Sequence, residues 1–353
     1  METKRYERAS NIELLRIIAM LMIIGVHYLG SSDAEILTSQ HTVSNGVFIC
    51  VMSLCNIGVN LFVLITGYFM INAKSIKVSK IAKLLIDTLI YGMLLYGVSV
   101  LVGINNFQLG ELIKSAVPIF AGYRWFIKAY CILYILIPFL NKVLQAITKK
   151  QYQILIIIIL CLFSVWPSIL PSPPLDDYGY GFIHLIVLYT ISGYIRRFGV
   201  QLTNWLLIMA ALGGYFMTIV ICFAGNPNLP FFGTLYSYKW AYNSPFNILF
   251  AVAVFVLFTR VSFTNHIINI LASSAFAVFL IHGDHNIMNY LFIDICRAPV
   301  TFNSIGWLPY MLSCIIAIYI ICFIIDSIKK RLLNSLIDAF LDKTNLVSLE
   351  IKV

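Results

Sequence analysis

Two ionisable side chains, Arg16 and His27, lie eleven positions apart, and every residue between them is apolar or glycine. At about 100° per residue, eleven steps make roughly three helical turns plus 20°, so on a helix both side chains share one face, about 16 Å apart. An ionisable group in a membrane helix costs on the order of 2.5–3.5 kcal/mol, and such groups usually mark a site or a pathway. The spacing therefore predicts a site for a long, polar ligand.

Other apolar segments carry polar residues that we expect at the depth of His27, toward the outer half of the membrane. These residues, with His27, are Arg124, Lys128, His184, His282, Asp284 and His285. Glu13 lies one turn before Arg16, at the cytoplasmic end of the same segment, and can neutralise its charge. The sequence therefore predicts two polar levels joined by one helix face.

Each of these groups also has a structural interpretation. His27 could form a hydrogen bond between helices, and Arg16 with Glu13 could be an ion pair that reaches the headgroups. Arg124 and Lys128 could anchor the chain at the membrane surface. His282, Asp284 and His285 could offer three metal ligands, but their spacing is not a known zinc pattern and no further ligands are evident, so we expect no metal.

Composition places these residues in a membrane protein. Of 353 residues, 60% are apolar and 11% charged, and the mean hydropathy is +0.90, unlike any soluble domain of this length. The first apolar run has no small-residue cleavage site after it, so we expect it to remain as the first helix. Apolar runs of about 18–23 residues predict an all-α, polytopic fold, with one membrane domain over 1–353 and about ten transmembrane helices. The predicted spans are 13–30, 47–71, 82–103, 124–141, 152–169, 180–195, 203–223, 244–260, 270–292 and 307–325.

The distribution of charge predicts the orientation of these spans. Most of the 24 Lys and Arg residues fall on one side, which the positive-inside rule makes cytoplasmic, and both termini lie on that side. Because the basic residues form short clusters between apolar spans, the net charge of +9 does not indicate nucleic-acid binding. The cytoplasmic clusters are Lys4 to Arg8, Lys74 to Lys83, Lys142 to Lys150, Arg196 and Arg197, Arg260, and Lys329 to Lys352.

The outer loops and the cysteines indicate no additional domain. Asp33, Glu35, Asp176 and Asp177 are expected in outer loops. The longest of these, 167–179 and 224–243, contain prolines and aromatic residues, which favours lids or interfacial belts. The eight cysteines form no CxxC pair, and we interpret them as reduced core residues.

Four stretches resemble the integral-membrane acyltransferase-3 family, whose bacterial members acylate surface polysaccharides and related glycans. They are Arg16 with His27 eleven positions later, the glycine-framed segment Gly58 to Tyr68, the segment Trp125 to Asn141, and Ala272 to His282. The chain departs from the family pattern at four positions. Glu13 stands where Asp is usual, Ile17 where a small residue is frequent, Thr66 where Ser is usual, and Arg124 where His often occurs. Arg16, His27 and His282 match the family pattern. Because of the four departures, the sequence does not predict which acyl donor is preferred.

The resemblance implies transfer of an acyl group, in our interpretation acetyl, from cytoplasmic acyl-coenzyme A to a hydroxyl of a glycan or lipid-linked saccharide. Acyl-CoA would be a co-substrate, with no permanently bound cofactor. Independently of the family, a cation at Arg16 can hold donor phosphates, and a pantetheine arm is about as long as the interval to His27.

The matched positions imply roles for individual residues. His27, with an ordinary pKa of about 6.5, would be the general base. Arg124 or His282 could stabilise the oxyanion or orient the acceptor. The expected catalytic residues are Arg16, His27 and His282, and the expected substrate-binding residues are Glu13, Asn60, Arg124, Trp125 and Lys128.

The family also implies a setting, and other functions stay open. We expect a multi-pass protein of the bacterial cytoplasmic membrane, with envelope-polysaccharide assembly proteins as possible partners. A non-catalytic transporter or flippase of a glycan or small polar solute would instead act without acetyl-CoA. A structural subunit of an envelope assembly would tolerate replacement of His27.

Overall fold

The computed structural model describes residues 9–32, 43–117, 124–170, 172–224, 230–302, 304 and 306–352. The described chain is mostly helical, with one short two-stranded sheet. The predicted all-α class is therefore confirmed. The N-terminal basic cluster from Lys4 to Arg8, and Asp33 and Glu35 of the first outer loop, lie outside the described residues.

Seven helical segments of the described chain are long and apolar enough to cross a membrane. They match seven of the predicted spans, so a multi-pass helical protein is also confirmed. The segments are α1 (Ser10–Gly30), α3 with α4 (Val43–Cys55 and Gly58–Met70), α5 (Val78–Leu101), α7 (Trp125–Ala146), α8 continuing through a π-helical turn into α9 (Lys149–Leu160, Cys161–Val165 and Trp166–Ile169), α11 (Asn204–Ala224) and α17 (Trp307–Lys343).

The other predicted spans are shorter helices or broken ones. α10 (Phe182–Phe198) occupies the place of span 180–195, and α13 (Pro245–Thr259) that of 244–260. The prediction of one span over 270–292 is wrong as a continuous helix. The chain there forms α14 (His266–Ala272), α15 (Ala275–His282), a turn, and a π-helical stretch, Tyr290–Ile295. Short connecting helices are α6 (Leu109–Ala116), α12 (Pro230–Ser237) and α16 (Ala298–Thr301).

Side chains from elsewhere in the chain satisfy the backbone where these helices break. Lys330 of α17 donates to the carbonyl of Ser273 (3.2 Å) and to the hydroxyl of Ser274 (3.0 Å), between α14 and α15. Arg124 donates to the carbonyl of Leu280 in the last turn of α15 (3.0 Å). An interrupted helix at membrane depth needs such partners, because lipid offers none. The long-range hydrogen bonds are the physical reason why apolarity alone does not predict the breaks.

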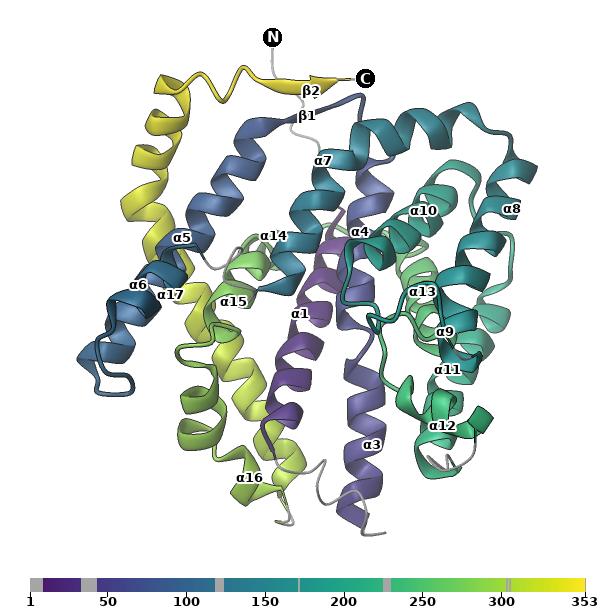
Figure 1. Ribbon diagram of the computed structural model, residues 1–353, viewed down its shortest axis with the longest axis horizontal. Coiled ribbons are helices and arrows are strands. Elements are labelled where there is room, and N and C mark those ends of the chain that lie inside the picture. Colours follow the sequence, from purple (N-terminus) through teal and green to yellow (C-terminus); the bar gives the residue numbers. More distant parts are fainter. Residues whose placement is uncertain are drawn as a thin grey trace.

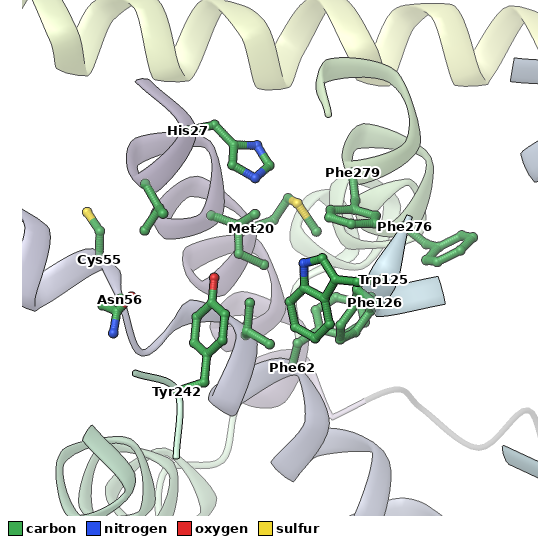
Figure 2. A pocket seen from close by; sticks show the side chains of 13 residues that line it. Met20, His27, Cys55, Asn56, Phe62, Trp125, Phe126, Tyr242, Phe276 and Phe279 are labelled. Atoms are coloured by element: carbon green, nitrogen blue, oxygen red, sulfur yellow. The ribbon is translucent and has the colours of Figure 1, made fainter. Parts of the chain in front are cut away.

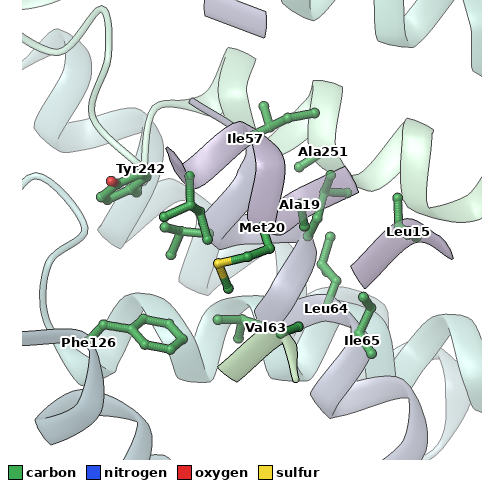
Figure 3. Packing of buried hydrophobic residues seen from close by; sticks show 14 of the residues in the cluster. Leu15, Ala19, Met20, Ile57, Val63, Leu64, Ile65, Phe126, Tyr242 and Ala251 are labelled. Atoms are coloured by element: carbon green, nitrogen blue, oxygen red, sulfur yellow. The ribbon is translucent and has the colours of Figure 1, made fainter. Parts of the chain in front are cut away.

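α1 lies at the centre of the bundle (Figure 1), in contact with α3, α4, α13, α14, α15 and α17. Its buried residues Leu15, Ala19 and Met20 pack beside Val63 of α4 and Ala251 of α13 (Figure 3). Lipid tails are as apolar as these side chains, so close packing rather than escape from water favours the association of the helices. The packing fixes α1, and with it Arg16 and His27.

Two glycines allow α4 to approach its neighbours closely. A Cβ at Gly58 would lie 2.7 Å from the backbone oxygen of Ala19 in α1. A Cβ at Gly67 would collide with Ser192 Oγ and would lie 2.9 Å from the backbone of Tyr189 in α10. Small residues at such contacts are typical of membrane helix pairs. The two glycines therefore hold α4 between α1 and α10.

A short sheet joins the segment before α5 to the last described residues. β1 (Ser75–Lys77) pairs antiparallel with β2 (Glu350–Lys352), with Ile76 opposite Ile351. Both strands lie at the end of the bundle where α1 begins (Figure 1). The arrangement agrees with the charge pattern, which assigns these two segments to the same side of the membrane.

Candidate active site

Arg16 and Glu13 form the predicted ion pair on α1, with Arg16 Nη1 2.7 Å from Glu13 Oε2. Both residues line a cavity of about 760 Å³ whose walls come from α4, α5, α7, α10, α14 and α15. Arg16 also lines an adjoining cavity of about 320 Å³, together with Lys80 and Tyr130. Ligand pockets typically measure about 300–1,000 Å³, so this polar level has room for a sizeable organic molecule.

His27 lines a separate and much smaller cavity of about 30 Å³ (Figure 2). By this measure one water needs about 10–15 Å³, so the space holds on the order of two waters. Trp125 and Tyr242 line the side of the cavity opposite His27, with their ring planes stacked and centroids 5.6 Å apart. The second predicted polar level is thus an enclosed aromatic pocket.

Three phenylalanines line both cavities: Phe62 of α4, Phe126 of α7 and Phe276 of α15. We refer to these three residues as the aromatic wall. The rings of Phe62 and Phe126 meet edge to face, with centroids 6.1 Å apart, and Phe126 meets Phe279 in the same way at 5.5 Å. A ligand that reaches from one cavity into the other must therefore pass beside these rings.

His282, the last residue of α15, lies beside His27, with ring centroids 5.1 Å apart. Its Nδ1 is 2.6 Å from the carbonyl oxygen of Val278. A carbonyl oxygen only accepts, so Nδ1 carries the hydrogen and Nε2 of the neutral ring keeps a lone pair. Neither His282 Nε2 nor His27 Nδ1 has a hydrogen-bond partner among the described residues. Other buried polar atoms of the described chain also have no partner, for example Ser53 Oγ and Asn247 Oδ1, but the two histidine atoms belong to predicted catalytic residues.

Arg124 forms a buried ion pair with Asp284, just beyond α15. Asp284 also accepts hydrogen bonds from the backbone and side-chain nitrogens of Asn286, at 3.0 and 2.9 Å. With its bond to Leu280, Arg124 thus uses both terminal nitrogens to hold the end of α15. These contacts support a role in positioning His282, whereas Arg124 was expected at the oxyanion or the acceptor.

The remaining predicted residues occupy different surroundings. Asn60 is fully buried, with its amide oxygen 2.9 Å from His184 Nε2 and its amide nitrogen donating to the carbonyl of Tyr242 at 2.9 Å. These bonds anchor the segment that carries Tyr242. Lys128 is exposed on α7, and His285 Nδ1 lies 3.9 Å from Asp284. The described residues contain no group of three or more His, Cys, Asp or Glu placed to hold a metal ion.

Several residues of the site were not singled out from the sequence. The aromatic wall lies in three of the four stretches that resemble the family, but its members are apolar residues within apolar helices, and residue type alone did not single them out. Tyr242 belongs to the segment 224–243, which was interpreted as an outer lid or belt, yet Tyr242 is buried and lines the cavity at His27. Its nearby tyrosines and Trp240 were a signal, but one that also fits an interfacial belt.

The fold and the site together define a polytopic helical membrane protein with a cation-lined cavity at one polar level and a histidine pair at the other. A family model described as an acyltransferase domain matches residues 10–326. The chain belongs to the acyltransferase-3 family and is a membrane acyltransferase, as the resemblance indicated. Neither the comparison with curated proteins nor the comparison with solved structures found a match.

Proposed function

We propose that this acyltransferase moves an acetyl group from cytoplasmic acetyl-CoA to a hydroxyl of a surface polysaccharide or glycan precursor. The observation that carries the proposal is that α1 presents Arg16 to a large cavity and His27 to a small one across the aromatic wall. About 16 Å of helix separates the two residues, roughly the reach of a pantetheine arm. The nucleotide of the donor would lie near Arg16, and its thioester would reach His27.

In the proposed reaction, His27 accepts the proton of the acceptor hydroxyl while the oxygen attacks the thioester carbonyl. The tetrahedral intermediate then collapses, and the carbon–sulfur bond breaks. The CoA thiolate takes the proton from the His27 imidazolium, which leaves an O-acetyl ester and free CoA. Atoms and charge balance without a metal or an oxidant.

Neighbouring groups support this chemistry. Neutral His282 has its one N–H on the carbonyl of Val278, so it can accept a hydrogen bond from His27 but has no second N–H for an oxyanion. We therefore assign His282 a positioning role. Trp125 lines the cavity, and in Figure 2 its indole nitrogen lies on the ring edge turned toward His27. An indole N–H placed there can donate to the thioester carbonyl as negative charge develops on it.

The proposal includes the setting of the enzyme. Ten membrane spans, cytoplasmic termini and a bacterial cytoplasmic membrane would give the cavity at Arg16 access to cytoplasmic donor. The acceptor would approach the level of His27 from the other side, with envelope-polysaccharide assembly proteins as partners that supply it.

The experiment is mass spectrometry of surface glycans from cells with the gene, without it, and with a His27→Ala gene. We expect glycans to carry an acetyl group only in the first strain. Unchanged acetylation in the strain without the gene would contradict the proposal. Normal acetylation by a well-expressed His27→Ala protein would exclude His27 as the general base. It would favour a transporter or structural role for the protein.

A further inference from the structure

Arg196, in the last turn of α10, lines the same cavity of about 760 Å³ as Arg16. The sequence distinguished it only as part of a basic cluster on the cytoplasmic side. Its neighbour Arg197 has a structural role, because its guanidinium donates to the carbonyls of Leu144 and Gln145 at the end of α7. Two adjacent arginines therefore have different surroundings, and only Arg196 faces the cavity.

The charge of Arg196 is not compensated. Arg16 is paired with Glu13, so these two side chains together contribute no net charge to the cavity. Within the described part of the chain, no carboxylate lies within 4.0 Å of the Arg196 guanidinium. Its contacts are with a neutral group, Tyr68. The attraction of this cavity for an anion thus depends on Arg196 more than on Arg16, with Lys80 contributing from the adjoining cavity.

Tyr68 holds the guanidinium without using up its donors. Arg196 Nη1 donates to the Tyr68 hydroxyl at 3.1 Å, and its Cζ lies 4.8 Å from the centroid of the Tyr68 ring. A guanidinium has five N–H donors in a planar fork, so several can still bind phosphate oxygens. The close contact of Gly67 with Ser192 fixes α4 against α10, and thereby Tyr68 beside Arg196.

We propose that Arg196, aligned by Tyr68, binds the phosphate groups of the nucleotide end of the acyl donor. The inference rests on the proposed function for the identity of the donor and adds a recognition residue to it. The ligand it predicts is a thioester whose far end carries phosphates, held between Arg196 and Arg16. A lipid headgroup phosphate has the same chemistry, and the experiment must separate these two sources.

Equilibrium binding of coenzyme A and of pantetheine to the purified protein in neutral-lipid nanodiscs tests the proposal without an acceptor. We expect Arg196→Ala to weaken coenzyme A binding by roughly tenfold or more, the loss that about 1.4 kcal/mol produces. Arg196→Lys should recover part of the affinity, because charge remains and the fork is lost. Pantetheine, which lacks the nucleotide phosphates, should bind the wild type and Arg196→Ala equally. Lys142→Ala, which removes an exposed charge from the last turns of α7, is the matched control.

Each other outcome overturns a separate statement. If the wild-type protein does not bind coenzyme A, the proposed donor is wrong, and this inference fails with it. If the wild type binds coenzyme A and a folded Arg196→Ala protein binds it equally well, only the role of Arg196 is wrong. An affinity loss confined to nanodiscs that contain anionic lipid would assign Arg196 to headgroup phosphates instead.

The Tyr68→Phe variant keeps the aromatic ring and loses only the hydroxyl that accepts from Arg196. We therefore expect it to lose less affinity for coenzyme A than Arg196→Ala does.

Discussion

His27 is the residue whose replacement should separate catalysis from folding. An intramembrane hydrogen bond between helices contributes on the order of 1 kcal/mol, and His27 Nδ1 makes none within the described chain. His27→Gln should therefore accumulate in the membrane normally, while acyl transfer falls by about 10²–10⁴-fold, the usual effect of losing a positioned general base. Immunoblots of membranes and transfer of labelled acetyl groups measure the two effects.

A matched control for this prediction is His266→Gln, because His266 is exposed at the start of α14. It should lower neither protein level nor activity. Comparable losses of transfer in the two variants would indicate a general effect of removing a histidine and would contradict the assignment of His27.

The ionisable residues of the candidate site could be predicted from residue types and spacing. The pairing of Glu13 with Arg16 is confirmed, and His27 and His282 do lie together. Asn60 and His184 show the limit of this reasoning. Both are buried polar residues, but they hydrogen-bond to each other, and a sequence does not show which buried groups are partners.

At the scale of secondary-structure elements, the position of the end of α15 depends on the buried ion pair between Arg124 and Asp284. Arg124→Leu would leave Asp284 as an unpaired buried charge, which typically costs about 3–5 kcal/mol. Adding Asp284→Leu should recover much of that loss, because no buried charge remains. Thermal unfolding in detergent measures both changes.

The exposed pair of Lys83 and Asp338 provides the control for the buried pair. Lys83→Leu should cost no more than about 1 kcal/mol, since exposed ion pairs contribute little. Equal stability of Arg124→Leu and Lys83→Leu would show that the buried pair does not hold α15 in place.

The aromatic wall predicts a change in donor preference. Phe276→Ala would widen the passage between the two cavities, so the ratio of kcat/KM for butyryl-CoA to that for acetyl-CoA should rise about tenfold or more, since a methylene in a pocket contributes 1–3 kcal/mol. Phe69→Ala, in the cavity at Arg16 but not in the wall, should leave the ratio unchanged. An unaltered ratio for both variants would mean that the wall does not select the acyl group.

Hydropathy was sufficient for four of the continuous helices, but not for the interrupted ones or for the end of α17, which continues to Lys343 beyond the predicted end at residue 325. α1, α5, α7 and α11 begin and end within a few residues of the predicted spans, because each is one apolar run. The break before α15 depends on Lys330, and the end of α15 on Arg124, both far away in the chain. Such breaks are stabilised by tertiary hydrogen bonds, so no local pattern predicts them.

For the whole molecule, the prediction is the orientation in the membrane. Reporter fusions after Lys80, Lys150, Arg197 and Lys330 should all read cytoplasmic, and fusions near Asp33 and Asp176 should read external. The structure adds a constraint that does not depend on charge. Because Ile76 pairs with Ile351, reporters at Lys80 and after β2 must read the same side, whichever side that is.

The reporter fusion after Arg197 is the most informative of these measurements, because it tests both the topology and the side of the membrane that the cavity faces. Arg196 and Arg16 line one cavity, and the proposed donor must enter it from the cytoplasm, where acyl-CoA is made available. A cytoplasmic signal after Arg197, with an external signal near Asp176, would place α10 across the membrane with its arginines on the donor side. An external signal after Arg197 would exclude the ten-span topology, and it would also turn the cavity away from the cytoplasm. The same measurement would then contradict both the orientation and the route of the donor to His27.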